Sequence, residues 1–358
     1  MDLSTPSTIP VTPLAAVDQG WDELSVWLES TGNANTMKAY NSAWKRFESF
    51  CNESKRSALP ANALTVALYI KSLSESEYAG STIASALACV SHKHALRGLP
   101  SPCSDAAVSR ARRVAVNAAG PTVGRDAFSR EDLDTIFSAL RESGRTNWNC
   151  LRSGALLALT TLGLLRGSEV VNLRWGDVTF DCTPMSGPRA NPSAVRAINS
   201  ASIKIARSKT DQKGVSAVVV VADAFARNSV WCWLDLWKQC LSGKFPSAGT
   251  RDADWIFPNL SKEDRLNKHI SVATVSKRFK DLAAMLDLDP SRFGSHSGRK
   301  AGATALVQAG VSVPQLKNHG RWKSDAVYKY YVPGMKEKLA VTLDLFDDAG
   351  ENLESFNL

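Results

Sequence analysis

Four side chains near the carboxyl end of the chain have a spacing that constrains the fold more than any other feature. His296 and Arg299 are three residues apart, which places an imidazole and a guanidinium on one side of a helical turn. Trp322 follows, and Tyr331 lies nine residues beyond it. The pattern calls for a helix at the first pair and a chain reversal that brings the tyrosine back. Together these groups suit chemistry on a phosphate.

Two segments of the sequence resemble a known family. The run HSGRKAGATALVQAGVSVPQLKNHGRW, followed by the tyrosine, resembles the catalytic box of the tyrosine recombinases, the phage integrase family. It is closest to the Cre type in HSxR, AGVSxP and GxW. Upstream, LLRGSEVVNLRWGDV resembles the family segment that carries the first catalytic arginine. The resemblance gives Arg166 that position and Glu169 the supporting acidic position, although on the residues alone they are an ordinary helical pair.

The resemblance leaves two candidates for the nucleophile. Tyr331 is the first choice, because AGVSxP aligns without gaps and Trp322 then keeps its Cre-type distance from Arg299. Some mobile-element relatives carry GRWxSxA with the tyrosine one residue earlier, which would select Tyr330. Neighbouring residues point about 100° apart on a helix, so only one of them can face the phosphate.

A β-hairpin is expected between the two motifs. SIKIARSKTDQKGVSAVVVV contains two β-type runs joined by a polar turn at residues 211–214. The resemblance implies a catalytic lysine on this hairpin, and Lys209 takes that place, with Lys204 and Lys213 nearby. Residues 179–200 are longer than a tight hairpin needs and are predicted to form a surface insertion of unknown role.

The resemblance also implies a role for each side chain. Arg166 and Arg299 would bind the non-bridging phosphate oxygens, a task that suits the guanidinium fork. His296 would move a proton, Lys209 would protonate the leaving 5′ hydroxyl, and Trp322 would hydrogen-bond the phosphate. The product would be a 3′ phosphotyrosine, which a second strand attacks. Because the bond energy stays covalent, no cofactor and no metal is expected.

The composition is compatible with a DNA partner. The chain has 43 Lys and Arg against 35 acidic residues, a net charge of +8. Apolar residues at helical spacing, such as Trp21, Leu24, Trp27 and Leu28, predict four or five helices in the first third. Basic residues on these helices are candidates for phosphate contacts, although charge runs are equally often solvated faces. They are Lys93, Arg97, Arg110, Arg112 and Arg113.

The predicted fold is mainly α with a small antiparallel sheet, arranged as a helical core-binding domain and an α+β catalytic domain that form a C-shaped clamp on double-stranded DNA. Seven scattered cysteines without a CxxC pair favour reduced thiols in an intracellular compartment. The resemblance implies that the protein is soluble and DNA-associated. The expected boundaries are a disordered tail (1–18), the helical domain (19–118), a linker (119–128), the catalytic domain (129–335) and a terminal helix and tail (336–358).

The terminal segment bears on assembly. Leu339, Leu343 and Phe346 have helical spacing, and in the family such a helix packs into a neighbouring subunit. The resemblance therefore implies a homotetramer on two DNA sites, although the helix could instead fold back on its own domain. Two other functions stay open: a DNA-relaxing enzyme of the type IB topoisomerase class, and a non-catalytic DNA-binding protein of the same fold.

Overall fold

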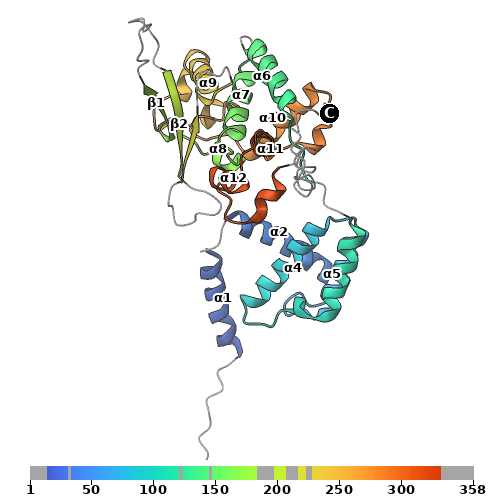
Figure 1. Cartoon of the computed structure of the whole chain (residues 1–358). Coiled ribbons are helices and arrows are strands. Elements are labelled where there is room, and N and C mark those ends of the chain that lie inside the picture. The colour runs from blue at the N-terminus through green and yellow to red at the C-terminus, as the bar shows by residue number, and fades with distance from the viewer. Residues whose placement is uncertain are drawn as a thin grey trace, which may run out of the picture. The chain divides into compact units, whose positions relative to one another are not determined.

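The chain divides into two compact units, residues 1–123 and 124–358 (Figure 1). The computed structural model describes residues 14–30, 34–120, 124–144, 147–183, 197–206, 217–222 and 228–331. Helices dominate this part of the chain, with one three-stranded antiparallel sheet, so the predicted fold class is confirmed. Within the same residues, no helix is long and apolar enough to cross a membrane.

Five α-helices make up most of the described part of the first unit. Side-chain caps begin two of them, since Asn62 accepts from the Thr65 N–H and Asp105 from the Ala107 N–H. The core contains Phe47, Tyr69 and Ile70, all at most 2% exposed. The helices are α1 (Leu14–Ser30), α2 (Ala34–Glu53), α3 (Ala63–Glu75), α4 (Gly80–Ala95) and α5 (Ala106–Ala118).

Helix α1 differs from the prediction in two ways. It begins at Leu14, so its first turn lies inside the segment predicted as a disordered tail. Its apolar stripe does not enter the core, because Trp27 is 63% exposed and Leu24 and Leu28 are each 39% exposed. Trp21 is half-buried and lies against Gly98. Helical spacing identified the helix correctly but not its burial.

The second unit is built around α7. Every residue of this helix from Arg152 to Thr161 is buried, and α6, α9 and α11 pack against it. A capping box begins α6, since Ser129 and Asp132 exchange hydrogen bonds of 2.8 and 3.0 Å. The helices are α6 (Arg130–Gly144), α7 (Trp148–Thr161), α8 (Gly167–Val170), α9 (Val230–Lys244), α10 (Val272–Met285), α11 (Ser297–Gln308) and α12 (Val313–Gly320).

The sheet has the order β1-β2-β3, with antiparallel pairing throughout (Figure 1). Its strands are β1 (Val178–Thr183), β2 (Ala197–Ile205) and β3 (Ala217–Ala222). Side chains alternate in β3, where Val219 and Val221 are buried while Val218 and Val220 are more than half exposed. The turn between β2 and β3, most of the predicted insertion and the terminal segment lie outside the described residues.

The end of the predicted linker belongs to the second unit. Phe128 is buried there and stacks on Phe293, with ring centroids 4.7 Å apart. Asp126 pairs with Arg292 at 2.6 Å, and its N–H donates to the Arg292 carbonyl. These contacts fasten the segment before α6 to the loop that leads into α11.

Glycines allow α11 to approach α7 closely. A side chain at Gly302 would overlap the carbonyl oxygen of Thr161, and one at Gly298 would overlap the Thr160 hydroxyl. Helix α11 carries Arg299, so this close approach sets the position of the arginine relative to the loop that follows α7.

We expect Gly302→Ala to lower the free energy of unfolding by about 1–3 kcal/mol, because the added methyl forces the two helices apart. The matched control is Gly243→Ala in α9, where an added Cβ meets nothing within 4 Å. That change should raise stability by up to ~1 kcal/mol. Calorimetric unfolding of both variants checks this, and a Gly302→Ala protein as stable as the wild type would contradict the packing described.

Candidate active site

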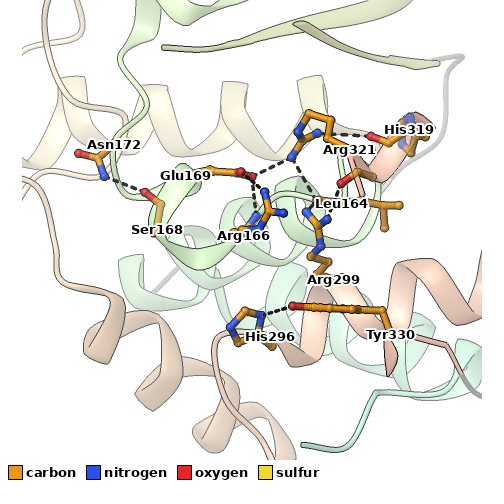
Figure 2. Close-up of polar contacts among 11 residues, drawn as sticks. Leu164, Arg166, Ser168, Glu169, Asn172, His296, Arg299, His319, Arg321 and Tyr330 are labelled. Atoms are coloured by element: carbon orange, nitrogen blue, oxygen red, sulfur yellow. Dashed lines mark hydrogen bonds and ion pairs between the residues drawn. The ribbon is translucent and has the colours of Figure 1, made fainter. Parts of the chain in front are cut away.

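Arg166 and Glu169 lie at the start of α8 and hold each other in place (Figure 2). The Arg166 guanidinium contacts Glu169 Oε1 at 2.6 Å through Nη1, and the Arg166 backbone N–H donates to Oε2 at 2.8 Å. The Glu169 side chain is only 1% exposed. The predicted pair is therefore a buried, charge-assisted contact and not a solvated one.

Arg321 is a second partner of Glu169 that sequence analysis did not single out. Its Nη2 lies 2.7 Å from Glu169 Oε2 (Figure 2). Arg321 ends α12 in the left-handed conformation, with φ of 57°. Glycine or asparagine usually occupies this position. The sequence feature that could have identified Arg321 is its position directly after Gly320, the last residue of the helix. An arginine is unusual at that position, which suggests a function for its side chain.

Arg299 lies on the first turn of α11 and is fully buried. Its guanidinium donates to the carbonyl oxygens of Leu164 and Gly320. Leu164 itself has a φ of 46°, which is uncommon for a branched side chain and turns its carbonyl toward the arginine. Burial, and then the charge of Arg166, lower the pKa of Arg299 to about 9.

The cluster has more positive than negative charge. Three guanidiniums, those of Arg166, Arg299 and Arg321, surround the single carboxylate of Glu169. Burial raises the pKa of Glu169, but the charges of Arg321 and Arg166 and the Arg166 N–H outweigh it and hold the pKa below its ordinary value. Glu169 is therefore ionised, and two positive charges remain for an anion such as a phosphate.

Trp322 covers the Arg299 guanidinium. The guanidinium carbon lies 4.2 Å from the centre of the indole ring, and Trp322 is 7% exposed. The indole nitrogen is buried and has no hydrogen-bond partner among the residues that the structure describes. A buried donor without a partner is costly unless a ligand satisfies it, which fits the predicted hydrogen bond to a phosphate.

Tyr330, and not Tyr331, lies with His296. The Tyr330 hydroxyl is 3.3 Å from His296 Nδ1 (Figure 2), and its ring centroid is 5.2 Å from that of Trp322. Tyr330 also lines a cleft of ≈ 450 Å³, whereas Tyr331 packs its ring 6.0 Å from that of Tyr328. Side chains around this cleft include those of Arg166, Ser168, His296, Trp322, Lys323 and Tyr330.

The other predicted site residues differ in how exposed they are, and one of them is not described. Lys209 lies outside the described residues. Lys93 pairs with Glu29 at 2.5 Å and its side chain is 19% exposed, while Arg97 is half-buried. Three arginines of α5 are exposed: Arg110, Arg112 and Arg113. In the described ranges, no group of three His, Cys, Asp or Glu side chains could hold a metal ion.

Comparisons with known proteins give one consistent answer. Residues 197–337 match the family model described as the phage integrase family. The chain is 27% identical over 315 residues to the integrase/recombinase xerD homolog of Selenomonas ruminantium, covering 85% of this chain and 83% of that protein. It is 24% identical over 325 residues to Recombinase cre of Escherichia phage P1, covering 88% of each.

Two solved structures share the fold. One is the XerH site-specific recombinase bound to palindromic difH substrate, a post-cleavage complex, with a TM-score of 0.60, 11% identity, and coverage of 92% of this chain and 85% of that one. The other is the Tn1549 transposon integrase in complex with circular intermediate DNA, with a TM-score of 0.58, 12% identity, and coverage of 91% and 98%.

The cleft brings Arg166, His296 and Tyr330 together, on a fold that the chain shares with a solved recombinase and a solved integrase. The resemblance seen in the motifs is confirmed, because residues 197–337 match the phage integrase family model and most of the chain is similar to two recombinases.

We expect Glu169→Gln to lower the free energy of unfolding at neutral pH by roughly 3 kcal/mol, because two partly buried arginines lose their carboxylate. The folded-state pKa of Glu169 lies below the ordinary 4.5, so its contribution is complete above that pH. On acidification the contribution is lost as the pH falls through the folded-state pKa. The gap between variant and wild type should therefore close at acid pH.

Urea unfolding from neutral pH to below 4.5 measures this gap. The matched control is Glu75→Gln, because the Glu75 carboxylate is 61% exposed and pairs only with Lys71 among the contacts of the described residues. Its effect should be small at every pH. A Glu169→Gln deficit that does not change with pH would show that the carboxylate is not ionised in the folded protein.

Proposed function

We propose that this protein cuts and rejoins DNA at a specific site through a 3′-phosphotyrosine formed on Tyr330. One observation carries the proposal: the Tyr330 hydroxyl lies 3.3 Å from His296 Nδ1, inside the cleft that Arg166 and Trp322 line. An imidazole at that distance is within reach of the phenol proton. The surplus positive charge beside it suits a phosphodiester.

The assignment of Tyr330 replaces the first choice made from sequence. The short turn Asp325–Lys329, capped by the Ser324 hydroxyl, ends at Tyr330 and directs its ring toward Trp322 and Arg299. Tyr331 follows and leaves the cleft. This arrangement supports the one-residue-shorter register of some mobile-element relatives.

The reaction follows from the groups in the cleft. The Tyr330 oxygen attacks the phosphorus, its proton passes to His296, and the bond from phosphorus to the 5′ oxygen breaks. A free phenol has a pKa of about 10 and is a poor nucleophile at neutral pH. Arg166 and Arg299 offset this by stabilising the charge on the non-bridging oxygens. The leaving 5′ oxygen takes a proton, for which Lys209 remains the candidate.

Phosphate binding requires a rearrangement at Arg299. Its guanidinium is covered by the rings of Trp322 and Tyr330 and is fully buried. The Tyr330 ring therefore moves off the guanidinium before a phosphate oxygen can contact it. The same movement frees the phenol oxygen for attack. Religation is the reverse step, with a 5′ hydroxyl of a partner strand attacking the phosphotyrosine, so that strands exchange through a Holliday junction.

The partner in this proposal is double-stranded DNA. The solved relatives named above were bound to DNA, which supports it. Exposed Arg110, Arg112 and Arg113 on α5 would add contacts to the phosphate backbone. Four copies would assemble on two sites, with the terminal segment of each packing on a neighbour.

We expect a nicked suicide duplex to trap wild-type protein covalently, because the cleaved fragment diffuses away and religation fails. The duplex is one selected by the wild-type protein from a random-sequence pool, with the nick moved along it in single steps. Tyr330→Phe removes the nucleophile and should abolish the adduct. Tyr331→Phe and Tyr328→Phe, the matched controls, should retain it. Denaturing gels of the protein–DNA adduct give the readout.

Each other outcome has a definite meaning. Loss of the adduct only in Tyr331→Phe would move the nucleophile to the first sequence choice. Bound DNA that never becomes attached to the wild type would overturn the proposed activity in favour of a non-catalytic DNA-binding protein. Relaxation of supercoiled plasmid by a monomer, without sequence preference, would favour a type IB topoisomerase activity.

We expect deletion of residues 337–358 to weaken assembly on paired sites more than binding to one site, because the segment is proposed to act between subunits. Mass photometry of complexes on one-site and two-site duplexes measures both properties in one experiment. The full chain is the control. A deletion variant that forms complexes of unchanged size on the two-site duplex would contradict the proposed packing of this segment on a neighbouring subunit.

A further inference from the structure

We propose that Arg321 is a positioning residue for strand cleavage, which acts through Glu169 to keep the Arg166 guanidinium available to the phosphate. The inference rests on the proposed function and adds a residue to it. Arg321 is half-buried and does not line the cleft that contains Arg166, His296 and Tyr330. Its effect on the reaction therefore passes through the residues it contacts.

The contacts of Glu169 show how this works. Oε1 accepts from Arg166 Nη1 at 2.6 Å, while Oε2 accepts from the Arg166 backbone N–H at 2.8 Å and lies 2.7 Å from Arg321 Nη2. Both oxygens are thus occupied, with Arg166 supplying only one guanidinium nitrogen. A guanidinium has five N–H donors, so most of the Arg166 fork remains for an anion.

Removal of Arg321 would change this balance. The buried carboxylate would keep Arg166 as its one cationic partner among the contacts described, and an arginine facing a carboxylate alone prefers two parallel hydrogen bonds. Arg166 would then turn its fork toward Glu169, and its charge would be compensated locally. Without Arg321, the surplus positive charge of the cluster also falls from two to one.

The backbone at Arg321 supports the same conclusion. Its left-handed conformation, with φ of 57° and ψ of 40°, is disfavoured for a residue with a Cβ. The turn ends α12 and leads directly to Trp322, whose backbone N–H donates to the Lys317 carbonyl. The ion pair with Glu169 ties this turn to α8, so one side chain connects the segment that carries Trp322 to the one that carries Arg166.

The test measures the rate of adduct formation on the nicked duplex selected by the wild-type protein, together with duplex affinity and the unfolding temperature. Arg321→Met should slow cleavage roughly 10- to 100-fold with affinity nearly unchanged. Arg321→Lys should recover part of the rate, because it keeps the charge near Glu169. Adding Glu169→Gln to Arg321→Met should speed cleavage relative to Arg321→Met alone, since a neutral amide no longer draws in Arg166.

A purely structural role makes the opposite prediction, because the double variant would then be slower and less stable than either single variant. If Arg321→Met fails to fold, the comparison of Glu169→Gln with Glu169→Gln/Arg321→Met decides. Equal rates support action through Glu169, and a further drop overturns it. Wild type and Tyr330→Phe run alongside: no wild-type adduct would refute the proposed function, whereas a normal adduct with an unaffected Arg321→Met refutes only this inference.

Discussion

The buried carboxylate of Glu169 is the contact on which the rest of the site depends. It accepts hydrogen bonds from the backbone and side chain of Arg166, and its second oxygen binds Arg321. An ion with a 1% exposed side chain is stable only where such partners replace the lost water. Because the partners come from α8 and from the end of α12, the ion also joins two segments that are more than 150 residues apart in the chain.

Three arginines cluster around this carboxylate, although burial disfavours their charged form. One carboxylate cannot compensate three guanidiniums, and burial, followed by the charge of Arg166, lowers the pKa of Arg299. In the proposed reaction a phosphate supplies the missing negative charge, so the close approach of the guanidiniums becomes favourable when DNA binds. Until then, the carbonyls of Leu164 and Gly320 and the rings of Trp322 and Tyr330 occupy Arg299.

Sequence was sufficient where side-chain identity and helical spacing fix position. His296 and Arg299 fall at the start of one helix, and Arg166 and Glu169 on another, so the spacing placed them on the right elements. The proposed choice of Tyr330 over Tyr331 rests on the short 3-10 turn Asp325–Lys329, which the motif spacing did not predict. Sequence analysis missed Arg321 because glycine is the residue usually expected in the left-handed conformation at the end of a helix. The exposed stripe of α1 shows that periodicity predicts a helix without predicting what covers it.

A crystal structure of the wild-type protein on its selected duplex, with vanadate trapped at the cleavage position, tests the central claim most directly. Vanadate adopts the five-coordinate geometry of the transition state. The account predicts the Tyr330 oxygen at one apex, with Arg166 and Arg299 on the equatorial oxygens and Arg321 still paired with Glu169. Tyr331 at the apex, or Arg299 still bound to the Leu164 and Gly320 carbonyls with no contact to the vanadate, would contradict it.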